Sequence, residues 1–180
     1  MPKGIENLTL LRVLKGFVLG SYSKTPCRKS DLAANLKDLR KLGIRIVSGA
    51  VIQDGEFQSL KELSYLDHLK ISWGVFDRRY IDIQISVPSR LKKLHLEGFP
   101  GQNIPEWFKP SKLPKELEKL HITGGKLESL DHGENNNYWS MEFVYLRYLK
   151  HLDVDLKHLH ELFPSLRYVL NQPYFEKRLV

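Results

Sequence analysis

The stretch Leu91-Lys92-Lys93-Leu94-His95-Leu96 has the pattern L-x-x-L-x-L, and five related blocks recur along the 180 residues of the chain. Four of them end in isoleucine or valine: Leu39–Ile44, Leu66–Ile71, Leu117–Ile122 and Leu149–Val154. The first block begins at Leu11 and departs from the pattern, because it ends Leu14-Lys15-Gly16-Phe17. The middle leucines are 28, 27, 25, 26 and 32 residues apart, at Leu14, Leu42, Leu69, Leu94, Leu120 and Leu152.

A repeat with this core and a period of roughly 20–29 residues is typical of leucine-rich repeats. Each block is expected to form a short strand with its leucines inward, and neighbouring repeats stack because one repeat cannot bury its apolar face alone. We predict an α/β leucine-rich-repeat solenoid, with a curved parallel sheet on the concave face and irregular or short helical returns on the convex face. Residues 1–180 are expected to form one domain of about six to seven repeats with an uncapped N-terminus.

The segments between the blocks carry weaker patterns. Short helices are predicted at Asp31–Leu36, with Ser30 or Asp31 as the cap, and at Phe57–Leu63. Prolines flank Ile104–Phe108, which predicts an extended or single-turn return. Polar or glycine-marked loops are expected at residues 20–26, 99–103 and 133–137, the last within the longest spacing.

Two further segments are candidates for strands. Residues 79–87 alternate strictly, which predicts an added strand on the convex side or at an edge. The half-repeat Phe163–Val169 follows the sixth block and predicts a terminal strand or cap.

Composition limits the classes of protein to which the chain can belong. A single cysteine, Cys27, excludes an internal disulfide framework. No apolar run approaches the roughly 20 residues that span a bilayer, and the first residues lack the apolar core of a secretory signal. We therefore expect a cytoplasmic protein without a membrane span. The net charge of +7 permits acidic partners, nucleic acid or an anionic membrane surface without choosing among them.

Several blocks together resemble one protein family. Pro2–Phe17 resembles the LPxGIxxLxxLxxLxxF segment of plant coiled-coil, nucleotide-binding, leucine-rich-repeat disease resistance proteins, and Leu36–Ile44 is similar to their LKxLRKLxI block. Leu69–Gly74, Leu94–Phe99 and Pro105–Trp107 are similar to the same family, so that the resemblance covers about residues 1–170. It implies the leucine-rich-repeat region of a truncated receptor.

The chain departs from a full receptor of this family in its nucleotide-binding module. No G-x-x-x-x-G-K-[ST] motif is present, because Gly124-Gly125-Lys126 is followed by Leu127 and lacks the spaced first glycine. The resemblance therefore implies neither nucleotide binding nor a cofactor here, and we expect no cofactor.

The solvent-facing positions of the strands are the main candidate site. The residues before the middle leucines are Val13, Lys41, His68, Lys93, Lys119 and His151, and those after are Lys15, Gly43, Lys70, His95, His121 and Asp153. Nine of these twelve are lysine or histidine, which predicts a cationic face for a protein partner, with an acidic protein as one candidate. The alternative is an ordinary solvated face, which Asp67, Glu97, Glu118 and Asp155 partly neutralise.

Two aromatic residues beside the 133–137 loop are further contact candidates, because aromatic side chains often anchor interfaces. The predicted partner-binding residues are thus Lys15, Lys41, His68, Lys70, Lys93, His95, Lys119, His121, His151, Tyr138 and Trp139.

Metal and catalytic chemistry find little support. His68, His95 and His121 can stack across neighbouring strands, but the lysines beside them repel a cation. His158–Glu161 lacks the H-E-x-x-H spacing and is expected to be a surface turn. Cys27 has no visible base and orienting group, so we predict neither an enzyme nor a small-molecule substrate.

Two binding functions remain open. The first is a recognition module of plant innate immunity that binds an effector, a guarded host protein or the nucleotide-binding domain of a receptor. The second is a stand-alone adaptor or scaffold outside immunity, such as a substrate-recognition part of a ubiquitin ligase. Nucleic acid is disfavoured as a partner, because the aromatic residues mostly occupy apolar repeat positions.

Overall fold

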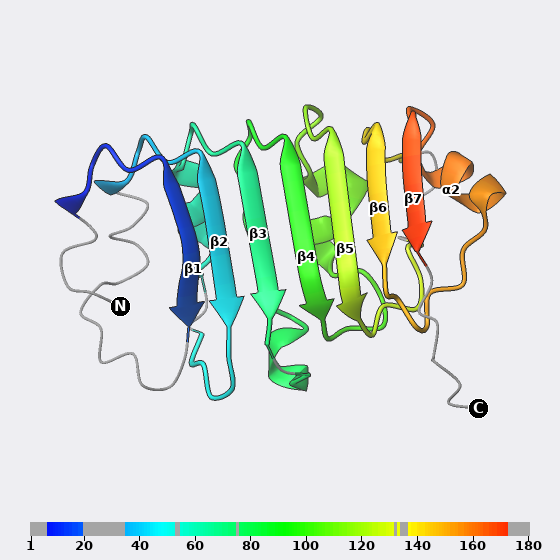
Figure 1. The fold of residues 1–180 in the computed structure, drawn as a ribbon, viewed down its shortest axis with the longest axis horizontal. Coiled ribbons are helices and arrows are strands. Elements are labelled where there is room, and N and C mark those ends of the chain that lie inside the picture. The colour runs from blue at the N-terminus through cyan, green and yellow to red at the C-terminus, as the bar shows by residue number, and fades with distance from the viewer. Residues whose placement is uncertain are drawn as a thin grey trace.

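Parallel strands, one from each repeat, form the centre of the structure. The computed structural model describes residues 7–19, 35–52, 55–74, 76–131, 133 and 137–172. Within these residues one seven-stranded sheet contains β1 (Val13–Leu19), β2 (Lys41–Ile46), β3 (His68–Trp73), β4 (Lys93–Phe99), β5 (Lys119–Gly125), β6 (Phe143–Arg147) and β7 (Tyr168–Gln172). The strands are all parallel and lie side by side in chain order, as Figure 1 shows. The leucine-rich-repeat fold predicted from the spacing is confirmed.

The register of the strands aligns their apolar residues in continuous rows. One row passes through the sheet from Leu14 to Val169, through Leu42, Leu69, Leu94, Leu120 and Val144. A second row contains Ile44, Ile71, Leu96, Ile122 and Leu146. Because residues two apart in a strand share a face, both rows point to the same side, where all but the terminal Val169 are buried.

The sixth strand differs from its prediction. It contains Val144 and Leu146, which pair with Leu120 and Ile122, and not the predicted block Leu149–Val154. Val144 follows Leu120 by 24 residues and precedes Val169 by 25, so the predicted spacing of 32 disappears. The stretch from Met141 to Leu146 has the same apolar pattern, with methionine and valine in place of leucine. This stretch forms the sixth strand because its distance along the chain from β5 and β7 matches the length of the neighbouring repeats.

The returns cover one side of the sheet. They contain the 3-10 helices η2 (Gln58–Glu62), η3 (Arg78–Tyr80), η4 (Glu106–Phe108) and η5 (Pro110–Lys112), and the α-helix α2 (Leu156–Leu162). The helical turns predicted within Phe57–Leu63 and Ile104–Phe108 are confirmed. Residues 158–161, expected to be a surface turn, lie in α2, where the carboxylate of Asp155 accepts the backbone N–H of His158 at 2.7 Å.

Some predictions concern residues outside the described ranges. Most of the expected helix at 31–36, the loop at 20–26 and most of the loop at 133–137 fall there, as does the N-terminal end that was expected to lack a cap. The terminal strand predicted from Phe163–Val169 is confirmed as β7, which begins at Tyr168.

The alternating segment 79–87 does not form a strand. It begins in η3 and continues as an extended return, in which Tyr80, Ile83 and Ile85 are buried against the core. The Tyr80 hydroxyl donates a buried hydrogen bond to the Ala50 carbonyl at 2.9 Å, which ties this return to the previous one. Alternate burial of an extended chain produces the same sequence pattern as a strand, so the prediction was wrong about pairing.

Two glycines near the ends of β4 and β5 differ in how closely a neighbouring backbone approaches them. Gly98 and Gly124 follow the paired residues Glu97 and Thr123, and both have left-handed backbone conformations with φ of +71° and +60°. A Cβ on Gly98 would lie 2.7 Å from the Trp73 carbonyl oxygen, whereas nothing lies within 4 Å of one on Gly124. Gly98 therefore meets a steric constraint beyond its conformation.

We predict that Gly98→Ala lowers the free energy of unfolding by roughly 2–4 kcal/mol, because it adds a backbone clash to the strain of a left-handed alanine. Gly124→Ala, which has only the strain, should cost about 1 kcal/mol. Urea denaturation followed by circular dichroism measures both values. Equal losses for the two variants would contradict the close approach at Gly98.

Candidate functional site

The side of the sheet opposite the returns, called the open face below, carries the strand residues that alternate with the buried rows. Its first row contains Val13, Lys41, His68, Lys93, Lys119, Phe143 and Tyr168. Its second row contains Gly43, Lys70, His95, His121, Tyr145 and Leu170, and Lys15 stands beside Gly43 at an irregularity of β1. The register therefore brings together most of the predicted partner-binding residues.

The change in the sixth strand alters the chemistry of one end of this face. His151, a predicted site residue, lies in the return after β6, and so does Asp153. Phe143 and Tyr145 take the two positions instead, and Tyr168 follows on β7. Sequence reasoning missed these aromatic residues, although the apolar pattern at Met141–Leu146 could have located them.

The aromatic pair at residues 138 and 139 divides between surface and core. Tyr138 is 57% exposed, as a contact residue must be, but Trp139 is only 2% exposed. The Trp139 ring packs against Phe108 and Phe163, with ring centroids 5.0 and 4.6 Å away. The prediction that Trp139 is a surface contact is therefore wrong, because neighbours in an extended chain point to opposite sides and the indole fills the core.

Lysines of the first row lack local compensation. Within the described residues no carboxylate forms an ion pair with Lys41, Lys93 or Lys119, whereas Lys70 pairs with Glu97. Burial, and then the charges of Lys119 and Lys41, lower the pKa of Lys93. Lys119 lies 5.0 Å from the centre of the Phe143 ring, an attractive cation–π distance. The row thus concentrates positive charge.

The two central histidines contribute rings but no charge near neutral pH. Burial lowers the pKa of His95 to about 4, helped by the charge of Lys70. Burial also lowers the pKa of His121 to about 4, with the charge of Lys93 as the next cause. The sequence prediction counted both histidines as part of the cationic face, and the structure corrects this.

A run of aromatic rings extends from the second-row histidines to Tyr168 of the first row, toward the C-terminal end of the sheet. The His95 and His121 ring centroids are 5.5 Å apart, and His121 stacks on Tyr145 at 4.1 Å with an interplanar angle of 21°. The Tyr145 and Tyr168 centroids are 5.5 Å apart. His68 belongs to the first row, where it contacts the carboxylate of Asp67, and does not continue the stack. In the described part of the chain, no cluster of His, Cys, Asp or Glu has the makings of a metal site.

A broad groove lies on the open face over the first four strands. It has a volume of about 690 Å³, and five cationic side chains line it: Lys15, Lys41, Arg45, Lys70 and Lys93. Glu97 contributes a carboxylate, and Gly43 forms part of the floor. The open face therefore combines a cationic groove at its N-terminal end with aromatic side chains at its C-terminal end.

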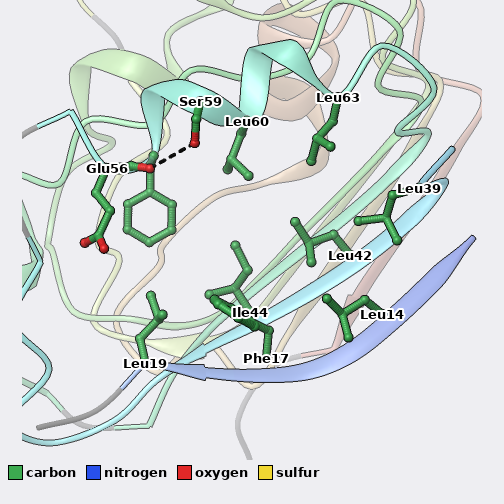
Figure 2. A pocket seen from close by; sticks show the side chains of 11 residues that line it. Leu14, Phe17, Leu19, Leu39, Leu42, Ile44, Glu56, Ser59, Leu60 and Leu63 are labelled. Atoms are coloured by element: carbon green, nitrogen blue, oxygen red, sulfur yellow. Dashed lines mark hydrogen bonds between the residues drawn. The ribbon is translucent and has the colours of Figure 1, made fainter. Parts of the chain in front are cut away.

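A second cavity, drawn in Figure 2, lies on the covered side of the sheet, between β1, β2 and η2. Its volume is about 20 Å³, which is room for one water molecule. Leucine side chains point into it from the strands and from η2, while the Ser59 hydroxyl donates to the Glu56 carbonyl at its rim, 3.3 Å away. This space is a packing gap in the apolar core between the sheet and its return.

Strands with the L-x-x-L-x-L pattern, one per repeat in a single parallel sheet, define a leucine-rich-repeat protein. Residues 31–159 match the family model described as R13L1/DRL21 LRRs, and the chain belongs to this family of leucine-rich repeats. Within the described residues, no helix has the length and apolar character needed to cross a membrane.

A similar protein is Disease resistance RPP13-like protein 4 of Arabidopsis thaliana. The two are 35% identical over an alignment of 176 positions that covers 93% of this chain and 20% of the relative. The chain thus spans about a fifth of the length of the curated relative that it matches. The predicted resemblance to the leucine-rich-repeat region of a plant disease resistance protein is confirmed.

The low pKa values of His95 and His121 predict a loss of stability in acid. Both rings bind protons less readily in the folded chain, where their pKa is about 4, than in the unfolded chain, where it is near 6.5. Their contribution to the free energy of unfolding is complete above pH 6.5, decreases as the pH falls toward 4 and is lost below that value.

Urea denaturation at several pH values between 7 and 4 measures this decrease. The double variant His95→Gln/His121→Gln should show a flatter dependence than the unsubstituted chain. Proton NMR should also show two imidazole titrations near pH 4 that disappear in the variant. Equal pH dependence for both proteins would contradict the assigned pKa values.

Proposed function

We propose that this chain is a protein-recognition module of plant innate immunity and that it binds its partner on the open face of the sheet. The similar Arabidopsis protein carries disease resistance in its name, which supports the biological setting. The observation that carries the proposal is the division of the sheet into two faces. The returns cover one face. The other presents the first-row lysines, which form no ion pair with a carboxylate of the described residues, beside aromatic side chains.

The open face approaches the area that a standard protein interface buries on one partner. Seven strands about 4.8 Å apart and roughly 20 Å long give a plane of roughly 600 Å² before side-chain relief is counted. A standard protein interface buries about 800 Å² on each partner. Tyrosine side chains, such as Tyr145 and Tyr168 on this face, are also enriched in binding hot spots.

The partner that we propose is a protein with an acidic surface. A pathogen effector, a guarded host protein and the nucleotide-binding domain of a receptor would all use this face, and we propose the cytoplasm as the place of binding. A stand-alone adaptor outside immunity would use the same surface, so the identity of the captured protein separates these functions.

Site-specific crosslinking tests the proposal. A photoreactive phenylalanine analogue replaces Tyr145 on the open face, and the chain is expressed in leaves during a resistance response. We expect the analogue at residue 145 to give at least several-fold more crosslinked product than the same analogue at residue 112. Lys112 lies in η5 on the covered side. Mass spectrometry then identifies the captured protein.

The control at Lys112 decides the result. Equal or stronger crosslinking from Lys112 would place recognition on the returns and overturn the proposed face. Capture of proteins of ubiquitin ligase complexes alone would support the adaptor function instead.

A further inference from the structure

Gly43 lines the groove of the open face without a side chain, whereas each other second-row position in the described strands carries one. The part of the groove next to Gly43 is called the hollow below. We propose that this hollow is a carboxylate-binding site that receives an aspartate or glutamate side chain from an extended acidic segment of the protein partner. The inference rests on the proposed function and specifies the chemistry of the partner.

The first argument is the charge around the hollow. The groove over Gly43 has five lysine or arginine side chains along its walls and one carboxylate, that of Glu97. Glu97 already pairs with Lys70, which leaves Lys15, Lys41, Arg45 and Lys93 as the remaining cations of the lining. An anion in the groove would therefore meet an excess of positive charge at short range.

The second argument is the electrostatic repulsion between lysines on neighbouring strands. The register sets Lys93 directly beside Lys119, and Lys41 lies two strands from Lys93 in the same row. The pKa of Lys93 is lowered by burial and by these two neighbours, which shows that nearby charges oppose its protonated form. A bound carboxylate would offset this repulsion, because positive patches on one partner face negative patches on the other in protein interfaces.

The third argument favours a peptide over nucleic acid. Single-stranded nucleic acid needs ring faces on which bases stack. Here His121 and Tyr145 stack on each other, with centroids 4.1 Å apart, so that each ring already has one face against its neighbour. The lysines also end at β5, because Phe143 and Tyr168 continue the first row, and a phosphate backbone would find no cations beyond that point in the row.

Strand spacing specifies the acidic segment. From β2, which carries Gly43, to β5, which carries Lys119, there are three strand spacings of about 4.8 Å, or about 14 Å. Side chains on one side of an extended peptide are about 6.8 Å apart, so residues i and i+4 span the same distance. A segment with acidic residues at alternate positions can place the first in the hollow and the others near Lys93 and Lys119.

Fluorescence polarisation with a synthetic peptide tests the inference. The probe is a fluorescein-labelled peptide of about nine residues with glutamate at alternate positions and serine between them, and the matched peptide has glutamine for glutamate. The whole chain is titrated at low ionic strength, because salt screens such contacts. We expect the glutamate peptide to bind at least about 10-fold more tightly than the glutamine peptide.

Gly43→Val is the decisive variant, because it fills the hollow without changing charge. A Cβ on Gly43 meets no atom closer than 3.6 Å, and its φ is outside the left-handed region, so the variant should fold, which circular dichroism verifies. We expect Gly43→Val to weaken the glutamate peptide at least about 10-fold. Lys41→Gln removes a cation from the rim and provides a second variant that should weaken binding.

Matched controls distinguish the hollow from general attraction to a basic protein. Lys112→Gln removes the same charge from the covered side and should leave the affinity unchanged. Equal binding of both peptides, unchanged affinity of Gly43→Val, or equal losses in Lys41→Gln and Lys112→Gln would each overturn the inference. A single-stranded RNA probe that binds more tightly than the glutamate peptide, with an affinity unchanged by Gly43→Val, would also overturn the inference in favour of nucleic acid. Crosslinking at Tyr145 can still succeed in any of these cases, so recognition by the open face would survive the loss of the hollow.

Discussion

The register between parallel strands is the constraint on which the rest of this structure depends. Each repeat contributes a strand whose apolar residues have no partner within the repeat, so burial requires that Leu69 lie against Leu42 and Leu94. The same register, continued through backbone hydrogen bonds, fixes the rows of the open face. Lys93 stands beside Lys119, and His95 beside His121, because the leucines between them are aligned.

This alignment has an electrostatic consequence. Strands about 4.8 Å apart bring side chains of one row close together, and identical charges then repel one another. His95 and His121 are half-buried and uncharged near neutral pH, and the His121 ring stacks on Tyr145. Lys41, Lys93 and Lys119, in contrast, lie in one row and form no ion pair with a carboxylate of the described residues. A face that repels itself in this way is well suited to an acidic partner, which is the physical link between the fold and the proposed recognition.

Predictions from the sequence succeeded where one pattern had no competitor. The first five strands follow the spacing of their leucines, and the terminal strand follows from Phe163–Val169. They failed where two patterns overlap or where one pattern has two structural causes. Leu149–Val154 matches the leucine pattern more closely than Met141–Leu146 does, yet Met141–Leu146 contains the strand that pairs with β5. His151 therefore lies outside the open face. The alternation of residues 79–87 reflects burial of a return, and Trp139 beside Tyr138 is buried by the returns around it.

The sequence by itself determined the class of fold and the polar character of the open face over the first five strands, because strand geometry sends every second residue outward whatever its neighbours are. Only the tertiary structure decided which block became β6, which aromatic residue of the pair at 138 and 139 reached the surface, and that the central histidines are neutral. It also decided that Gly43 lies among cations from four strands. These outcomes depend on pairing, burial and charge between residues far apart in the chain, and no local pattern contains that information.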